Sequence, residues 1–352
     1  MLMKKKFGLF TLILFLMVGL VACSDDDEYE YQEDPTEPEV TGSGSEIHGA
    51  IHRIEYGDHV VYLFGSMHAG ESAWYPLADV VEDAMARADV FAFEFDFTMA
   101  SYSPEEIAEI VAAMSGDHTL PDDQTLAEFL SEEVYENLVY HLPSYDVDYE
   151  DVYRQNPIAL SMSIQTDVSL ALFREIGISP TYSIDFYVLN VAMEREVPII
   201  GLEPTMQQVR IAFTPDEEIL ETAGFDAFTI DEIMEASVVD FVSRDALIEA
   251  LADEMNLHEY YVANDLTRIN ELFQPTPEMM DNAYGRYMID VLMNFRSTYY
   301  ANEIARLLQD TEEPTTFFVT VGISHVMREG EHLTNIVEQL DLLGIEAVPI
   351  FE

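Results

Sequence analysis

The chain of 352 residues contains one cysteine, Cys23. A single thiol cannot close a disulfide within the chain, so no disulfide framework supports the fold. The sequence also lacks three catalytic signatures: a His-Glu-x-x-His segment, a Gly-x-Ser-x-Gly elbow and a glycine-rich phosphate loop. The sequence therefore gives no support for the commonest kinds of zinc peptidase, serine hydrolase or nucleotide-binding protein.

Basic residues are scarce, since 15 Lys and Arg stand against 68 Asp and Glu and give a formal net charge of −53. Removal of Lys4, Lys5 and Lys6 with a leader peptide changes −53 to −56. So large an excess repels nucleic acid and anionic lipid, and we expect neither as a partner. It favours solubility in salt-rich or alkaline surroundings and attracts divalent cations without specificity.

Residues 1–22 have the pattern of a signal peptide, with three lysines followed by an uncharged apolar run. The run is short for a transmembrane helix, which needs about 20 apolar residues. It ends in Leu-Val-Ala-Cys at residues 20–23, which resembles the bacterial lipoprotein box. We therefore predict that Cys23 is lipidated and anchors the chain in the cell envelope, facing outside the cytoplasm. An ordinary secretory signal with an incidental cysteine is the alternative.

Residues 23–46 are acidic and then rich in Pro, Gly and Ser, with almost no aliphatic side chains. Such a segment cannot bury enough apolar surface to offset the entropy lost on ordering, so we predict a disordered linker. Residues 47–352 are within the length range of one large domain, and we treat them as one.

Two Gly-x-x-His segments, at residues 65–68 and 322–325, each follow a run of apolar residues. Continuous apolar runs are typical of strands buried on both faces, as in parallel sheets. Open α/β sheets bind their ligands at the carboxyl ends of the strands. We therefore expect Gly65 to turn the chain sharply and His68 and His325 to meet at one rim of a sheet. A third match, at residues 49–52, precedes its apolar run, which places His52 inside a strand and away from that rim.

The remaining patterns alternate between strand and helix. They predict an α/β fold with a mixed, mostly parallel central sheet, flanking helices and a helical insertion. The expected elements are a hairpin at 50–64, a helix from Pro76, strands at 90–95 and 197–202, helical stretches at 104–177, 184–196 and 215–310, and, after the strand that ends at Gly322, a helix and a last strand at 347–350.

Two carboxylates stand near predicted strand ends. Glu94 lies between Phe93 and Phe95, and a buried carboxylate is costly unless it is paired or binds a metal. The alternative is an alternating strand with Glu94 facing solvent. Glu203 follows the strand at 197–202 and so repeats the layout of His68.

Arg296 is notable because arginine is rare in this chain. Its guanidinium could donate two hydrogen bonds to a carboxylate or to the oxyanion of a reaction intermediate. A salt bridge to one of the many surface acids is the alternative.

Two imidazoles and a carboxylate form a donor set that suits zinc, manganese, cobalt or iron(II) and not calcium. We predict one divalent transition metal per chain, bound by His68, His325 and Glu94, with an open position where a water becomes a nucleophile. Glu203 would be a further ligand or the general base, and Arg296 would stabilise the oxyanion.

These motifs resemble the TraB/PrgY/GumN family, which includes the Tiki metalloproteases. The resemblance extends from about residue 48 to the C-terminus, with departures at Ser183, Pro204 and Ser297, where the family usually has Gly, Thr and Asn. Besides the two Gly-x-x-His segments, the similar elements are Glu94, Ile184-Asp185, Gly201-Leu202-Glu203 with Gln208, Asp265 and Arg296.

The resemblance implies a core like that of erythromycin-esterase-like, ChaN-like and Tiki proteins, and it adds Asp185 to the metal site. Which of Glu94, Asp185 and Glu203 bind the metal directly stays open. The implied activity is that of a metal-dependent, peptidase-like hydrolase acting on a peptide or small molecule. A protein that captures a peptide pheromone without cleaving it, and a haem- or iron-binding protein, are the alternatives.

Overall fold

The fold was obtained as a computed structural model that describes residues 46–115, 118–121, 124–251, 256–327 and 329–350. The predicted signal peptide, the lipidation site Cys23 and all but the last residue of the predicted linker lie outside the described residues.

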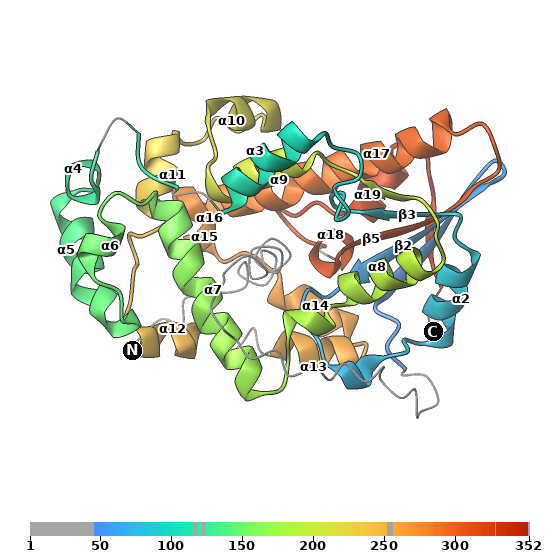
Figure 1. Cartoon of the computed structure of the whole chain (residues 1–352), viewed down its shortest axis with the longest axis horizontal. Coiled ribbons are helices and arrows are strands. Elements are labelled where there is room, and N and C mark those ends of the chain that lie inside the picture. Colours follow the sequence, from blue (N-terminus) through green and yellow to red (C-terminus); the bar gives the residue numbers. More distant parts are fainter. Residues whose placement is uncertain (1–45, 116–117, 122–123, 252–255, 328, 351–352) are drawn as a thin grey trace.

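The six strands form one sheet in the order β4-β3-β5-β2-β1-β6. Strands β2, β5, β3 and β4 run parallel to one another, whereas β1 is antiparallel to both β2 and β6. The predicted mixed, mostly parallel sheet is therefore confirmed (Figure 1). The strands are β1 Ala50–Tyr56, β2 His59–Ser66, β3 Val90–Phe93, β4 Ile199–Gly201, β5 Thr316–Gly322 and β6 Ala347–Pro349.

The register of β2 against β5 brings the two Gly-x-x-His segments side by side, because Ser66 pairs with Gly322. The last residues of both strands are buried. Gly65 does not turn the chain as expected. It lies within β2, paired with Ala50 on one side and Val321 on the other.

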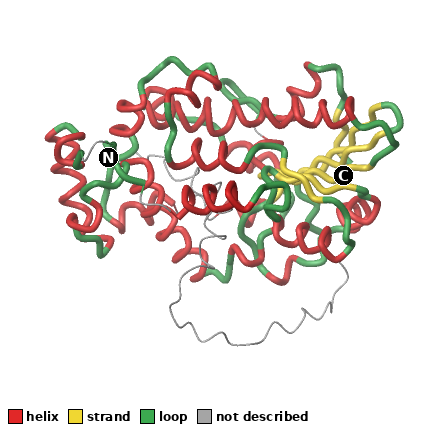
Figure 2. Tube along the Cα trace, turned by 45° about the horizontal axis from the view of Figure 1, so that its top comes forward, coloured by secondary structure: helices red, strands yellow, loops and turns green. Residues whose placement is uncertain are grey.

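Helices joined by loops and turns make up most of the remaining described chain (Figure 2). They are α2 Asp79–Arg87, α3 Pro104–Ser115, α4 Leu126–Phe129, α5 Glu132–His141, α6 Tyr149–Val152, α7 Pro157–Glu175, α8 Ile184–Glu194, α9 Thr205–Phe213, α10 Glu217–Ala223, α11 Ile230–Ala236, α12 Arg244–Leu251, α13 Asn256–Val262, α14 Leu266–Leu272, α15 Pro277–Asp281, α16 Ala283–Tyr287, α17 Arg296–Asp310, α18 Ile323–Met327 and α19 Ile336–Leu342. The 3-10 helices η2 Ser72–Trp74, η3 Leu142–Tyr145 and η4 Pro180–Tyr182 and the π-helix η5 Met288–Phe295 complete the list. None of these helices in the described ranges is long and apolar enough to span a bilayer.

The buried apolar side chains form two cores. One surrounds the sheet and includes Phe64, Phe91 and Phe318. The other lies among the helices of the insertion and includes Leu138 and Val291. In Figure 1 the sheet occupies one end of the molecule, helices α4, α5 and α6 occupy the other, and α7 crosses between them. The predicted helical insertion therefore has a hydrophobic core of its own.

One helix starts later than the sequence suggests. The helix expected from Pro76 begins at Asp79. The side chain of Glu82 accepts a hydrogen bond from the backbone N–H of Leu77 and so caps the N-terminus of this helix. The capping box at Thr125 and Glu128 is present as its spacing suggests.

Candidate functional site

The imidazole of His68 contacts the carboxylate of Asp185 through Nδ1. Nδ1 of His68 lies 2.9 Å from Oδ2 of Asp185, although the two residues are 117 apart in the sequence. The hydroxyl of Ser66 donates to Oδ1 of the same carboxylate at 2.7 Å. Burial alone would lower the pKa of His68, but Asp185 and Glu94 raise it above its ordinary value. Asp185 therefore orients the ring, with its two oxygens directed at His68 and Ser66.

His325 has a similar arrangement on the neighbouring strand end. Its Nδ1 lies 2.9 Å from the hydroxyl of Ser297, and both residues are fully buried. The ring also packs edge-on against Tyr300, with 5.2 Å between the ring centroids. In both His68 and His325, Nδ1 therefore lies within hydrogen-bonding distance of a side-chain oxygen.

The glycines of the two segments make room for each other. A Cβ on Gly322 would stand 3.0 Å from Nε2 of His68 and 3.3 Å from Oε1 of Glu94. A Cβ on Gly65 would stand 3.1 Å from Cα of Ile323, which lies in the second segment. Neither glycine has a positive φ, so both are needed for close approach and not for a turn.

Glu94 lies just beyond the end of β3 and is only 1 % exposed, which excludes the solvent-facing alternative. Its Oε1 accepts the backbone N–H of Gly322 at 2.7 Å. Its Oε2 accepts from Arg296 at 2.8 Å and from Nε2 of Gln208 at 3.3 Å. Burial alone would raise the pKa of Glu94, but Arg296, His325 and His68 lower it to about 2. Glu94 is therefore ionised.

Arg296 joins the two predicted carboxylates. It donates to Oε1 of Glu203 from Nε at 2.8 Å and also from Nη2, which in addition contacts Glu94 and the hydroxyl of Tyr300. Tyr300 itself donates to Oε1 of Glu203 at 2.5 Å. Burial disfavours the charge of Arg296, but Glu203, Tyr300 and Glu94 hold its pKa above the ordinary value. Burial raises the pKa of Glu203 in spite of Arg296.

The guanidinium of Arg296 donates to carboxylates, which is one of the expectations for this residue. The ion pair is not a surface salt bridge, because Arg296 is 1 % exposed. Two of its donors are already occupied by Glu94 and Glu203, so they would have to exchange partners before they could stabilise an oxyanion.

The helix that carries Arg296 has an unusual start. The π-helix η5 leads directly into α17, and Arg296, Ser297 and Tyr300 follow within two turns. Arg296 contacts Glu94 and Glu203, Ser297 contacts His325, and Tyr300 contacts Glu203. π-Helical turns are rare and often occur at functional sites.

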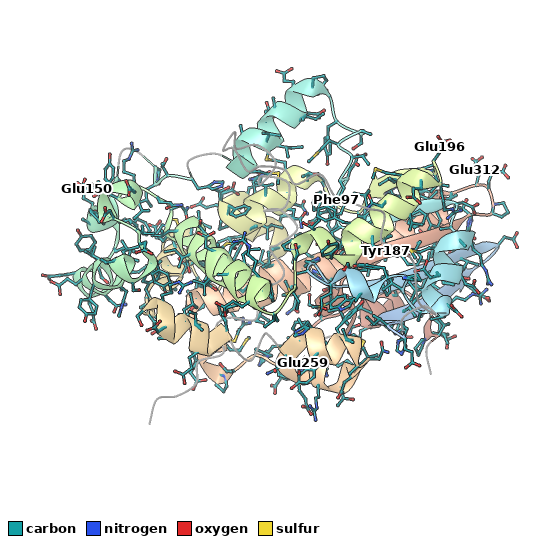
Figure 3. All side chains as sticks on the ribbon, turned by 60° about the horizontal axis from the view of Figure 1, so that its bottom comes forward. Phe97, Glu150, Tyr187, Glu196, Glu259 and Glu312 are labelled. Atoms are coloured by element: carbon teal, nitrogen blue, oxygen red, sulfur yellow. The ribbon has the colours of Figure 1, made fainter. Side chains whose placement is uncertain are left out.

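The whole site is enclosed. The exposed fraction is at most 5 % for His68, Glu94, Asp185, Glu203, Arg296 and His325. By contrast, the labelled glutamates Glu150, Glu196, Glu259 and Glu312 lie at the periphery on different sides of the molecule (Figure 3). The acidic surface is thus separate from the three carboxylates of the site.

The donor chemistry of the site fits a divalent transition metal. His68 and His325 supply imidazoles, and three buried carboxylates, on Glu94, Asp185 and Glu203, oppose the single guanidinium of Arg296. The positions fit less closely. In the part of the chain that the structure describes, no group of three or more His, Cys, Asp or Glu stands where it could hold an ion. Binding would therefore require side chains to move, Glu94 above all, because Arg296, Gln208 and Gly322 already contact its oxygens.

The structure thus brings together every predicted site residue that lies in the described ranges: His68, Glu94, Asp185, Glu203, Arg296 and His325. Asp265 lies elsewhere and caps α14 by accepting the backbone N–H of Arg268. Sequence analysis assigned no contact in the site to Ser66, Gln208, Ser297 and Tyr300. A signal existed for Tyr300, which is one helical turn from Arg296.

Comparison with known proteins places these motifs in context. The model of the TraB/PrgY/gumN family matches residues 50–341. The uncharacterized protein YbaP of Escherichia coli K12 is 21 % identical over 281 residues, which cover 78 % of this chain and 86 % of YbaP. YbaP of Shigella flexneri matches with the same identity and coverage. No solved structure matches the chain significantly.

Proposed function

Because the chain belongs to the TraB/PrgY/gumN family, we propose that it is a metal-dependent hydrolase with peptidase-like activity and that His68, His325 and Glu94 bind the metal. The family alone leaves the reaction open, so the proposal depends on the site.

The observation that carries the proposal is the contact made by Nδ1 of each histidine. Asp185 lies 2.9 Å from Nδ1 of His68, and the hydroxyl of Ser297 lies 2.9 Å from Nδ1 of His325. Histidines that bind metals generally have one ring nitrogen on the metal and the other hydrogen-bonded to a carboxylate or another oxygen. This arrangement fixes the ring orientation before the metal arrives.

Each remaining residue has a role in this proposal. A bound metal would lower the pKa of a coordinated water and so supply a nucleophile near neutral pH. The raised pKa of Glu203 suits a group that accepts a proton from that water, and Tyr300 and Arg296 keep its carboxylate in place. Exclusion of bulk water strengthens the electrostatic effect of Arg296 on any developing negative charge.

The first test is elemental analysis after dialysis at high salt, which removes cations held loosely by the acidic surface. We expect about one transition metal per chain in the wild-type protein and loss of the metal in His68→Ala and His325→Ala. His52→Ala is the matched control, because His52 has the same Gly-x-x-His spacing but lies inside β1. Wild-type protein without a stoichiometric metal would refute the metal part of the proposal.

The second test addresses the reaction. A mixture of defined peptides is incubated with the wild-type protein and with His68→Ala, and the products are identified by mass spectrometry. Cleavage that His68→Ala lacks supports hydrolysis. Peptides that are retained but remain intact would favour capture without turnover. A haem absorption band that stays with the protein after free haem is removed by gel filtration would favour the haem-binding alternative.

We further propose that the protein is anchored in the cell envelope through a lipid on Cys23, outside the cytoplasm. Support comes from the leader and the Leu-Val-Ala-Cys sequence at residues 20–23. Mass spectrometry of the N-terminal peptide tests this directly. We expect a diacylglycerol-modified Cys23 in the wild-type protein and release of Cys23→Ala from the membrane fraction. An unmodified cysteine in the purified chain would contradict the proposal.

A further inference from the structure

Gln208 on α9 contributes a polar group to the site that has no partner. The residue is 3 % exposed, and its Nε2 donates to Oε2 of Glu94 at 3.3 Å. Its amide oxygen, Oε1, is buried and accepts no hydrogen bond from any residue that the structure describes. Buried polar groups are normally satisfied, so an unsatisfied oxygen beside the central carboxylate requires an explanation.

The neighbouring carboxylate fixes which way this amide points. Oε2 of Glu94 accepts from the guanidinium of Arg296 and its Oε1 accepts from the backbone N–H of Gly322, so the carboxylate acts as an acceptor and the NH₂ group of Gln208 faces it. The reverse orientation would bring two acceptors together. Oε1 is bonded to the same carbon as Nε2, so it also lies beside Glu94, and it can interact favourably only with a donor.

Two buried hydroxyls close to Gly322 in sequence, Oγ1 of Thr320 and Oγ of Ser324, also have no partner. A hydroxyl can rotate and act as donor or acceptor, so these two say little about the ligand. The amide oxygen differs because its role is fixed. A ligand that satisfies Oε1 of Gln208 must bring an N–H or O–H group.

We propose that Oε1 of Gln208 accepts a hydrogen bond from an N–H of the bound substrate and makes the site select amides over esters. The inference rests on the proposed hydrolase and names its substrate class. A site built to bond a substrate N–H discriminates strongly against analogues without it, because the protein acceptor is then left buried and unpaired. Peptides satisfy the requirement, whereas esters of the same shape do not.

The test uses two small metal-chelating probes that differ at one nitrogen. Acetohydroxamate carries an N–H, and N-methylacetohydroxamate lacks it. Binding of both is measured by calorimetry to the full protein in excess Zn²⁺ and moderate salt. We expect wild-type protein to bind the N–H probe at least roughly tenfold more tightly. In Gln208→Met, which keeps the length of the side chain without its amide, the two affinities should agree within about twofold.

Two controls separate hydrogen bonding from size and from general damage. Propionohydroxamate adds a carbon of similar size but retains the N–H, and it should bind wild-type protein like acetohydroxamate. Gln165→Met makes the same chemical change on α7, where Gln165 bonds Ser161, and should keep the wild-type preference. Equal binding of the two nitrogen variants by wild-type protein would overturn the inference, as would a preference that survives in Gln208→Met.

Failure of this inference can be told apart from failure of the proposed function. If wild-type protein retains its metal and cleaves peptides but binds both probes equally, the hydrolase stands and the role of Gln208 falls. If wild-type protein retains its metal but binds neither probe, the probes do not reach Gln208 and the inference is wrong. If neither metal nor cleavage is found, the proposed function fails on its own tests.

Discussion

At Gly322 the lack of a side chain is what allows the imidazole of His68 and the carboxylate of Glu94 to approach each other. A methyl group there would stand 3.0 Å from Nε2 of His68, closer than such atoms normally come. If the site binds the proposed metal, Gly322→Ala should weaken that binding by about 10- to 100-fold, because ring and carboxylate must move apart. Competition with a chromophoric chelator measures this affinity.

Gly57→Ala provides the contrast. Gly57 has a φ of +60° in the turn between β1 and β2, with nothing near its missing side chain. Its substitution should cost about 1 kcal/mol of unfolding free energy and leave metal affinity unchanged. If Gly322→Ala bound metal as tightly as Gly57→Ala, close approach at this site would not matter.

Asp185 and His68 predict a dependence of stability on pH in metal-free protein. The pKa of His68 is raised above 6.5 in the folded state, despite its burial, by Asp185 and Glu94. When folding raises the pKa of a histidine, the protonated ring stabilises the folded protein. This contribution is complete at pH values below the pKa of the unfolded state, and it is lost as pH rises through the pKa of the folded state. Asp185→Asn should therefore cost about 3 kcal/mol near pH 6 and less near pH 9.

Urea unfolding in the presence of a chelator measures this difference at both pH values. Asp310→Asn is a suitable control, since Asp310 pairs with Arg306 at the exposed surface. We expect Asp310→Asn to change the unfolding free energy by less than about 1 kcal/mol, with no difference between the two pH values. A cost for Asp185→Asn that grew with pH would contradict the assignment of the proton to His68.

On the scale of elements, the one helix α17 carries Arg296, Ser297 and Tyr300, which all contact the site. Tyr300 lies one turn after Arg296, and its hydroxyl donates to Glu203 in a fully buried setting. Tyr300→Phe should lower the unfolding free energy by about 1–3 kcal/mol, because Glu203 loses a donor it cannot replace with water.

The adjacent residue gives a matched comparison for chemical denaturation. Tyr299 is partly exposed, so Tyr299→Phe should change stability by less than about 0.5 kcal/mol. Equal effects of the two substitutions would mean that the hydroxyl of Tyr300 contributes little to holding Glu203.

The strands were largely predictable because their apolar runs and turns are local signals. The hairpin of β1 and β2 and the strand β5 follow from residues adjacent in sequence. The contacts of the site were not predictable in the same way. Asp185 reaches His68 across 117 residues, and whether Arg296 meets surface or buried acids depends on packing that periodicity does not report.

On the scale of the molecule, the two cores predict that stability can be lowered without harm to the site. Leu138 is fully buried in the helical core, away from the sheet. Leu138→Ala should lower the unfolding free energy by about 2–5 kcal/mol, while the folded protein keeps the affinity of wild-type protein for the proposed metal. Leu342→Ala, at a leucine that is 76 % exposed, should change stability by less than about 0.5 kcal/mol.

Equilibrium unfolding and metal titration on the same samples decide this prediction. A loss of affinity in folded Leu138→Ala would show that the helical core also shapes the site. The apolar stripe with Phe129, Val134 and Leu138 indicated helices that bury one face, but periodicity does not show whether that face packs on the sheet or in a separate core.

The π-helix η5 has a consequence for how this site can change over evolutionary time. In an α-helix one added or lost residue rotates everything after it by about 100° around the helix axis, whereas a π-turn holds about one more residue than an α-turn. Loss of a single residue between Met288 and Phe295 would therefore let a wide turn tighten to an α-turn, and Arg296, Ser297 and Tyr300 would still face Glu94 and His325. The same loss within α17, between Arg296 and Tyr300, has no wide turn to take it up and would turn Tyr300 away from Glu203.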